Sequence, residues 1–289
     1  MKKNIQNLIL IIFTALTLVG CVKWAIYLAP SLIPNLSSVF FEECDPELAR
    51  ESLPADLKLL EGLLKNDPNN KTILNSLSMG FTGYAILFVE EKNPERASRL
   101  YLRAKAYGLR AMGKKWEKLL DTALTKQTIK TNLAAVGPKN LEGFFWAAFA
   151  WSAWINLNLD KAEALSQTGI IEACLEKILE IQPDYYHGLA YVLLASMLAA
   201  KPGMMGGQAR QARIFFDKAM EINRNKFLLV HYYYARYYAV RIQDNKLFFR
   251  LLDEINSTPA EALKDLCLIN AVIKIKAGNL RQKADELFF

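Results

Sequence analysis

The sequence is poor in the residues that build most catalytic centres. Only two histidines and four cysteines occur among its 289 residues. His187 and His231 stand beside no nucleophile motif, and the G-x-S-x-G, H-E-x-x-H and P-loop patterns are missing. No C-x-x-C pair or histidine cluster with the spacing of a metal site occurs either. We therefore expect a protein that is not an enzyme and that uses no cofactor and no metal ion.

A strong excess of one charge is also missing. The chain carries 36 basic and 29 acidic side chains, a net charge of +7, without a long run of like charges. Nucleic acid is therefore not an expected partner, and the mild basicity is compatible with an anionic membrane surface. Hydrophobic residues make up 52% of the chain and charged residues 22%, which is typical of a folded protein with one or two domains.

The most informative feature that is present is the N-terminal segment. Met1-Lys2-Lys3 is a short basic start, and an apolar run from Leu8 ends in Leu18-Val19-Gly20-Cys21. This order is typical of an export signal, and the last four residues resemble the bacterial lipobox, in which the cysteine is acylated and becomes the mature N-terminus. We expect residues 1–20 to be a signal peptide and Cys21 to anchor the chain to a lipid bilayer.

An uncleaved anchor helix is the alternative, because the apolar character continues through residues 24–28 toward the ~20 residues that a spanning helix needs. Both interpretations place the rest of the chain on the periplasmic face of a bacterial membrane. The outer membrane is favoured, because Val22 stands where an aspartate is associated with retention in the inner membrane. Residues 21–44 are expected to form a lipidated tether, and residues 45–289 a helical repeat domain.

Three cysteines remain once Cys21 carries lipid. Cys174 and Cys267 lie in helical apolar patterns and are interpreted as small buried hydrophobic residues, whereas Cys44, near the tether, has no assigned partner. A thiol or histidine hydrolase is a third class of function, and it would require Cys174 or Cys267 to meet a histidine in space.

From Asp45 onward the pattern is helical almost to the end. Asp45 is expected to cap a helix with Pro46 in its first turn, and apolar residues then recur at spacings of three and four. The preceding residues 22–45 contain Pro30 and Pro34, which we expect to break any continuous helix. No convincing alternating strand pattern occurs, so an all-α fold is predicted.

An internal repeat specifies the fold further. Residues 66–70 end one helix and open a pair of helices, and a comparable pair follows residues 180–184. The second helix of each pair has the spacing Ala-x3-aromatic-x2-Ala, in Ala97, Tyr101 and Ala104 and again in Ala212, Phe216 and Ala219. Looser copies are expected at 141–183 and 227–256. This is the tetratricopeptide pattern, so we predict a tetratricopeptide-like solenoid of helical hairpins, an α-α superhelix.

A ring-rich helix is the first candidate binding feature. Residues 144–154 are apolar all round, so this helix is expected to be buried on every side or to line an apolar cavity. Core packing and a cavity wall both stay open. The candidate ligand-contacting residues are its rings and the polar-tipped rings of two later helices: Trp146, Phe149, Trp151, Trp154, Tyr185, Tyr186, His187, Tyr233 and Tyr234.

The tyrosines and His187 could hydrogen-bond the head group of a ligand, or they could satisfy one another. A glycine-rich loop is the second candidate, either for contact with a ligand or partner or as a plain connection between helices. Its residues are Pro202, Gly203, Gly206 and Gly207. A phosphate cradle is not expected there, because the preceding strand and the following Lys-Ser or Lys-Thr are missing.

Several segments of the chain carry a family resemblance through their order and spacing. They are Phe81-Thr82-Gly83-Tyr84-Ala85, Asn93-Pro94-Glu95-Arg96-Ala97, Arg103 to Leu109, Trp146 to Asn156, the Pro202 to Gly207 loop and Ala235-Arg236-Tyr237-Tyr238-Ala239. Together they resemble the T component of TRAP (tripartite ATP-independent periplasmic) transporters. The resemblance covers residues 40–289.

This resemblance implies a non-enzymatic periplasmic accessory that works with an extracytoplasmic solute-binding protein and a membrane permease. It also implies a homotrimer with an apolar-lined pore or cavity, and hence the binding or passage of a hydrophobic small molecule. The alternative is an outer-membrane lipoprotein scaffold of tetratricopeptide type, whose groove binds peptides or assembly partners. The accessibility of the aromatic rings distinguishes these two hypotheses.

Overall fold

The computed structural model describes residues 31–119, 125–200 and 208–288. Across these residues the chain is helical and no strand occurs, which confirms the predicted all-α class. The α-helices are α3 (Leu32–Glu42), α4 (Pro46–Leu64), α5 (Lys71–Tyr84), α6 (Pro94–Met112), α7 (Lys115–Leu119), α8 (Lys126–Leu133), α9 (Leu141–Leu157), α10 (Ala162–Ile181), α11 (Tyr185–Ala200), α12 (Ala209–Asn223), α13 (Leu228–Tyr233), α14 (Asn245–Ser257), α15 (Cys267–Gln282) and α16 (Ala284–Leu287).

Shorter helical segments complete the chain path. Two π-helical segments, η1 (Ala85–Val89) and η4 (Tyr234–Ala239), continue α5 and α13, and three 3-10 turns follow at η2 (Pro138–Asn140), η5 (Ala260–Ala262) and η6 (Lys264–Leu266). Two sets of predicted features lie outside the described residues. They are the signal peptide with Cys21, and the loop residues Pro202, Gly203, Gly206 and Gly207.

Side-chain caps set where several helices begin. Asp45 accepts a hydrogen bond from the backbone N–H of Glu47 (2.8 Å), as the sequence predicts, and Pro46 takes the first helical position. Asn70 and Asn93 cap α5 and α6 in the same way. Because a cap satisfies a backbone donor that the helix itself leaves free, these residues fix the helix boundaries.

Helix α3 corrects the expectation that prolines prevent a helix before residue 45. Pro34 is the third residue of α3, where a backbone N–H has no partner within the helix, so its ring is tolerated. Ile33 and Phe41 are buried, and α3 packs on α5 and α15. Part of the segment expected to be a tether is therefore packed into the helical body.

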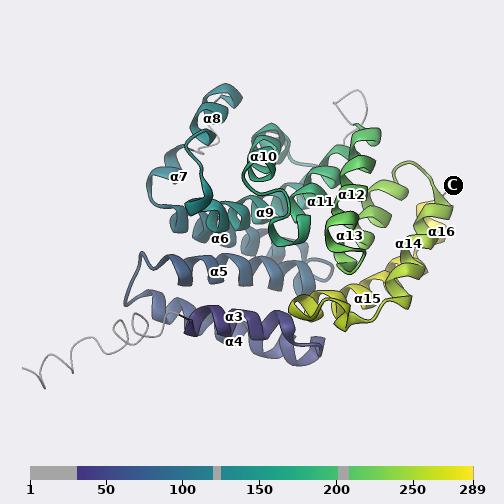
Figure 1. The fold of residues 1–289 in the computed structure, drawn as a ribbon, viewed down its shortest axis with the longest axis horizontal. Helices are drawn as coiled ribbons and strands as arrows, with labels where there is room; N and C mark the ends of the chain where they lie inside the picture. The colour runs from purple at the N-terminus through teal and green to yellow at the C-terminus, as the bar shows by residue number, and fades with distance from the viewer. Residues whose placement is uncertain (1–30, 120–124, 201–207, 289) are drawn as a thin grey trace, which may run out of the picture.

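Consecutive helices pack in pairs along the chain (Figure 1). The pairs are α5 with α6, α9 with α10, α11 with α12, and α13–η4 with α14. The alanine and ring positions predicted from their spacing on α6 and α12 are all fully buried: Ala97, Tyr101, Ala104, Ala212, Phe216 and Ala219. Helix α6 also runs close along α9, where a Cβ added at Gly108 would lie 2.8 Å from the carbonyl oxygen of Gly143.

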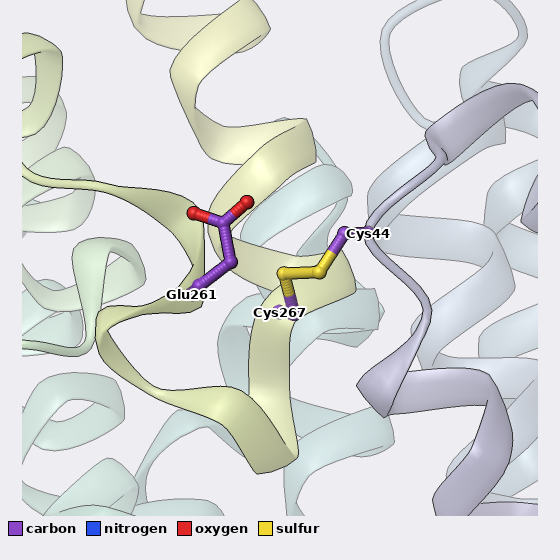
Figure 2. A group of neighbouring side chains, drawn as sticks. All are labelled: Cys44, Glu261 and Cys267. Carbon is purple, nitrogen blue, oxygen red and sulfur yellow. A yellow bond between two sulfur atoms is a disulfide. The ribbon is translucent and has the colours of Figure 1, made fainter.

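The last long helix, α15, returns to the first helices of the chain. It contacts α3, α4 and η1. A disulfide joins Cys44 to Cys267, the first residue of α15, with their Cα atoms 5.1 Å apart (Figure 2). Glu261 lies beside the two sulfurs, which are bonded to each other and are therefore not free to hold a metal ion. The start and the end of the helical body are thus covalently joined.

This disulfide corrects the interpretation of two cysteines. Cys267 is buried, as its apolar pattern predicts, but it is not an unpaired hydrophobic residue, and Cys44 does have a partner. The two positions are 223 apart in sequence, and a local pattern carries no information about pairing at that separation. Cys174 is free and buried, as predicted.

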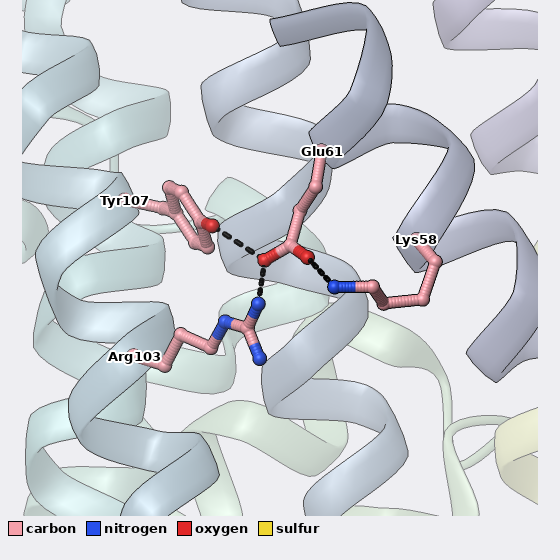
Figure 3. Close-up of polar contacts among 4 residues, drawn as sticks. All are labelled: Lys58, Glu61, Arg103 and Tyr107. Atoms are coloured by element: carbon pink, nitrogen blue, oxygen red, sulfur yellow. Dashed lines mark hydrogen bonds and ion pairs between the residues drawn. The ribbon is translucent and has the colours of Figure 1, made fainter. Parts of the chain in front are cut away.

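A polar network joins α4 to α6 (Figure 3). The Glu61 carboxylate accepts hydrogen bonds from Lys58 (2.6 Å), from Tyr107 (2.6 Å) and from Arg103. Burial raises the pKa of Glu61, but the hydrogen bonds from Lys58 and Tyr107 and the charge of Arg103 outweigh it, so the pKa lies below its ordinary value of 4.5. We call Lys58, Glu61, Arg103 and Tyr107 the Glu61 network.

Within the residues that the structure describes, Lys71–Val89 is the one segment long and apolar enough to cross a membrane, with a mean hydropathy of 1.4. Its apolar window is 83% buried inside the molecule. A core helix with this burial meets the same length and composition test, so the segment is only weak support for a membrane span.

Candidate functional site

The candidate rings chosen from the sequence lie in separate places. The first is the contact between α9 and the start of α11, which we call the α9–α11 cluster: Phe145, Trp146, Phe149, Tyr185 and Tyr186. Edge-to-face contacts join Trp146 to Tyr186, with 4.9 Å between ring centroids, and Phe145 to Tyr185, with 5.0 Å. The structure therefore brings together four of the predicted residues, from two helices that the sequence treats separately.

The backbone at the start of α11 is left-handed over three residues. Their φ angles are 46° at Tyr186, 58° at His187 and 77° at Gly188. Non-glycine residues in this region are strained, so the surrounding contacts must hold them. His187 Nε2 lies 2.9 Å from a carboxylate oxygen of Asp265, while Tyr186 is held by the α9–α11 cluster. The imidazole of His187, a predicted ligand-contacting group, is therefore paired with the Asp265 carboxylate of the same chain.

The rings of α9 are packed in the interior of the molecule. Trp146, Phe149, Trp151 and Trp154 are 3%, 4%, 1% and 5% exposed. The Trp151 indole donates a hydrogen bond to Gln167 (2.6 Å), and the ammonium group of Lys105 lies 3.4 Å from the centroid of the Trp151 ring. The expected burial of this helix on every side is confirmed. Its use as a cavity wall stays a prediction.

Tyr233 and Tyr234 are not part of the α9–α11 cluster, and the two tyrosines contact different rings. Tyr234 stacks on Phe216, with ring centroids 4.6 Å apart, and donates a hydrogen bond to Asp217 (3.0 Å). Tyr233 packs edge-on against Tyr237, with 5.1 Å between centroids. Of these two tyrosines, Tyr233 is the one that packs against a residue, Tyr237, lining a cavity.

Two neighbouring cavities lie where η1, η4 and α15 meet. Their volumes are about 350 and 300 Å³, and both are lined by Glu91, Lys276 and Asn279. The Lys276 ammonium and the Glu91 carboxylate form an ion pair of 3.0 Å at this shared wall. We call the smaller cavity the arginine pocket; its polar and aromatic lining includes Glu91, Tyr232, Arg236, Tyr237, Lys276 and Lys283.

Two π-helical segments lie next to side chains that line this pocket. Segment η1 ends just before Glu90 and Glu91, and η4 carries Arg236 and Tyr237. A π-helical turn accommodates an extra residue and rotates the side chains that follow it, and such turns are frequent at functional sites. Each segment ends the first helix of a packed pair: η1 follows α5, and η4 follows α13. Side chains from these two regions meet where Tyr232 donates a hydrogen bond to Glu91.

A chain of hydrogen bonds runs along the pocket wall. Arg236 donates to the Tyr232 hydroxyl (3.1 Å), which donates to Glu91 (3.3 Å). Burial raises the pKa of Glu91, but the charges of Lys276 and Arg236 outweigh it, so the pKa lies below its ordinary value and the carboxylate is ionised. Burial also raises the pKa of Tyr237 to about 12, against the lowering effect of Arg236. The pocket therefore presents charged basic groups beside neutral phenols.

Sequence reasoning missed Glu91, Lys276 and Lys283 as site residues. Arg236 and Tyr237 stand in a quoted family segment, but no binding role follows from the segment alone. One signal was available, since Lys276 is a charged residue within the apolar pattern of α15 and is 7% exposed. A lysine buried to this degree requires a partner. The partner, Glu91, is 185 positions away and is invisible to a local pattern.

Comparison with known families decides what the chain is. A family model of the TRAP transporter T-component matches residues 42–288. The chain belongs to this family. It is also 23% identical over 199 residues to an uncharacterized protein of Treponema pallidum (strain Nichols), a match that covers 63% of this chain and 62% of that relative.

The description of this family relates the T-component to a membrane transport system of the TRAP type. The matched residues include every residue of the arginine pocket and of the α9–α11 cluster. The two cysteines named for a thiol hydrolase, Cys174 and Cys267, are not available as thiolates in the described part of the chain. Cys267 is held in the disulfide, and burial raises the pKa of the Cys174 thiol to about 12.

Proposed function

We propose that this T-component is a periplasmic accessory, tethered to a membrane through acylated Cys21, that docks a TRAP solute-binding protein during solute uptake. The family match over residues 42–288 is the observation that carries this proposal. The lipobox-like segment before Cys21 supports the tether, and the outer membrane is its favoured location.

The proposal includes a tetratricopeptide-like solenoid and a homotrimeric assembly. Consecutive packing of helix pairs, with alanine and aromatic residues buried at the predicted spacing, supports the solenoid. The trimer is what the family resemblance implies. Native mass spectrometry of the purified chain measures it directly, and a monomer at micromolar concentration would contradict it.

Docking of the solute-binding protein is tested with purified components. The mature chain carrying Cys21→Ser is mixed with the TRAP solute-binding protein of the same organism, and association is followed by calorimetry and size-exclusion chromatography. We expect a complex of defined stoichiometry. A solute-binding protein from an ATP-driven uptake system is the matched control and is expected not to bind. Failure of the TRAP protein to bind, with and without solute, would overturn the proposal.

Passage of a hydrophobic solute is the finer part of the same proposal. The α9–α11 cluster would supply the apolar surface for the solute. Helix α11, which packs over these rings, departs from regular helical geometry at Tyr186 and His187. Tryptophan fluorescence is recorded during titration with a fatty-acid-like probe. A saturable change that a Trp146→Phe variant weakens is expected. No response, together with tight binding of peptides, would favour the scaffold alternative.

A further inference from the structure

Helix α3 exposes an apolar side at the edge of the helical body (Figure 1). Leu32, Leu36 and Val39 follow one another at spacings of four and three, which places them on one face of the helix. These residues are 46%, 42% and 64% exposed. Ile33 and Phe41 of the same helix are buried, and α3 packs on α5 and α15. Helix α3 therefore has apolar residues toward solvent as well as toward the core.

The exposed side of α3 is also uncharged. The helix carries no charged side chain before its last residue, Glu42. The Ser38 hydroxyl donates a hydrogen bond to the carbonyl oxygen of Asn35 (3.0 Å), and the Ser37 hydroxyl lies 2.9 Å from that of Ser76. A helix on the surface of a water-soluble protein has charged and polar residues on its outer side. Helix α3 instead can leave water without burying a charge or an unpaired hydroxyl group.

The apolar surface continues onto α4. A groove between the two helices is lined by Leu36 and Phe40 of α3, by Leu59 of α4 and by Met79 of α5, with Asp56 as its one carboxylate. Leu59 is 55% exposed. We call Leu32, Leu36, Val39 and Leu59 the α3–α4 face. An exposed apolar surface that extends over neighbouring helices is typical of a contact with a membrane or a protein.

The position of α3 in the chain favours a membrane as the partner. Ten residues separate Cys21 from Leu32, and at full extension they span about 35 Å. An attachment at Cys21 therefore holds α3 closer to the bilayer, along the chain, than any later helix. With eleven residues α3 is shorter than the ~20 residues of a spanning helix, so it can lie in the interface but cannot cross it.

We propose that the α3–α4 face lies on the lipid bilayer and is a second membrane contact beside the N-terminal anchor. Leu32, Leu36 and Val39 enter the boundary between head groups and acyl chains, where apolar side chains are stabilised without any charged partner. A single acyl chain gives only reversible membrane binding, so a second contact strengthens the attachment and also orients the helical body. This inference deepens the membrane tether proposed above and rests on an attachment at the N-terminus.

The test supplies that attachment itself. A hexahistidine tag is placed before residues 22–289 and binds nickel-chelating lipids in phosphatidylcholine vesicles, and flotation of the vesicles confirms that the chain is bound. An environment-sensitive nitrobenzoxadiazole label is attached through Val39→Cys, which leaves the two leucines of α3 in place. On vesicles we expect its emission to shift to shorter wavelengths and to be quenched by phosphatidylcholine that is brominated on its acyl chains, because the label leaves water.

A matched control places the same label on another helix. Ile214 of α12 is 49% exposed, and α12 packs on α11 and η4. The label attached through Ile214→Cys should show no shift and no quenching on the same vesicles. Labelling is specific in both chains, because Cys44 and Cys267 are joined in the disulfide and Cys174 is buried.

Two sets of substitutions then test the side chains themselves. In the chain labelled at position 39, Leu32→Ser together with Leu36→Ser should reduce the quenched fraction at least about twofold, because most of the apolar contact is lost. Ile214→Ser should leave the quenched fraction unchanged. All three side chains are exposed, so the melting temperature of each variant should stay within about 2 °C of the parent.

The outcomes separate this inference from the proposed tether. Because the tag replaces the lipid, a failure of Cys21 to be acylated in cells would overturn the tether without changing the vesicle result. An unshifted label at position 39 on vesicle-bound chain, or equal responses at positions 39 and 214, would overturn the inference. A label at position 39 that is already shifted in solution, increasingly so at higher protein concentration, would assign the face to a second copy of the chain and would also overturn it.

Discussion

Two arginines of this molecule lie beside aromatic rings but differ in what their guanidinium groups meet. Arg103, in the Glu61 network, lies over Phe81 and binds the Glu61 carboxylate between two helices (Figure 3). Arg236 lies over Tyr237 and meets a hydroxyl and a cavity instead. The same residue type therefore joins two helices where a carboxylate faces it, and borders a pocket where a hydroxyl group faces it instead.

The largest expected effect concerns the disulfide, which joins α15, a wall of the arginine pocket, to the segment before α4. Cys44→Ala removes a link that closes a loop of 223 positions, and the chain-entropy estimate gives a loss of roughly 5 kcal/mol in the free energy of unfolding, less where the denatured state is compact. Urea unfolding with and without a reductant measures it. Because Cys174 is free, Cys174→Ser is the control and should leave the effect of reductant unchanged.

The next effect separates the two arginines directly. Arg103→Gln leaves Glu61 without one of its two cationic partners and should lower the free energy of unfolding by about 1–2 kcal/mol. Arg236→Gln removes no ion pair but removes a hydrogen bond to Tyr232, and it should lower the free energy of unfolding by about 0.5–1 kcal/mol. Chemical denaturation of both variants provides the comparison. Equal destabilisation would show that Arg236 is a structural group, as Arg103 is.

A smaller effect appears on acidification. The pKa of Glu61 is lowered in the folded state, so this group contributes stability above its ordinary pKa of 4.5, and the contribution is lost as pH falls through the folded-state pKa. Glu61→Gln should therefore make the fall in stability below pH 4.5 shallower. Unfolding curves at a series of acidic pH values measure this slope. An unchanged slope in the variant would contradict the lowered pKa.

The smallest expected effects come from two hydroxyl groups. Tyr107→Phe removes a hydrogen bond of 2.6 Å to Glu61, and Tyr232→Phe removes one of 3.3 Å to Glu91. We expect losses of about 1 and about 0.5 kcal/mol, because the longer bond is weaker. Chemical denaturation of both variants tests this difference.

The sequence predicts the parts of this fold that depend on near neighbours. The cap at Asp45, the burial of Tyr101 and Phe216 and the all-round burial of α9 follow from spacings of a few residues. Helix α3 was missed because a proline in the first turn is read as a breaker, although it is tolerated there.

The candidate site was harder to predict than the fold. The arginine pocket is assembled from the turn after η1, from α13 and η4, and from α15 and α16, and its contacting residues are up to 185 positions apart. Trp146 and Tyr186 were selected for their ring content, and they meet, but ring content alone does not distinguish a packed interior from a cavity wall. That distinction depends on the packing of neighbouring helices, which a single sequence does not contain.

The bond between Cys44 and Cys267 has a consequence for biogenesis. In the periplasmic location proposed above, a chain that crosses the membrane amino end first would expose Cys44 to oxidants long before Cys267 arrives, with Cys174 emerging in between. The earliest available pairing is therefore a wrong one, and correct maturation requires that it be exchanged before α10 buries Cys174. Recombinant material made in a reducing cytosol avoids this competition but leaves α15 without its covalent link to the segment before α4.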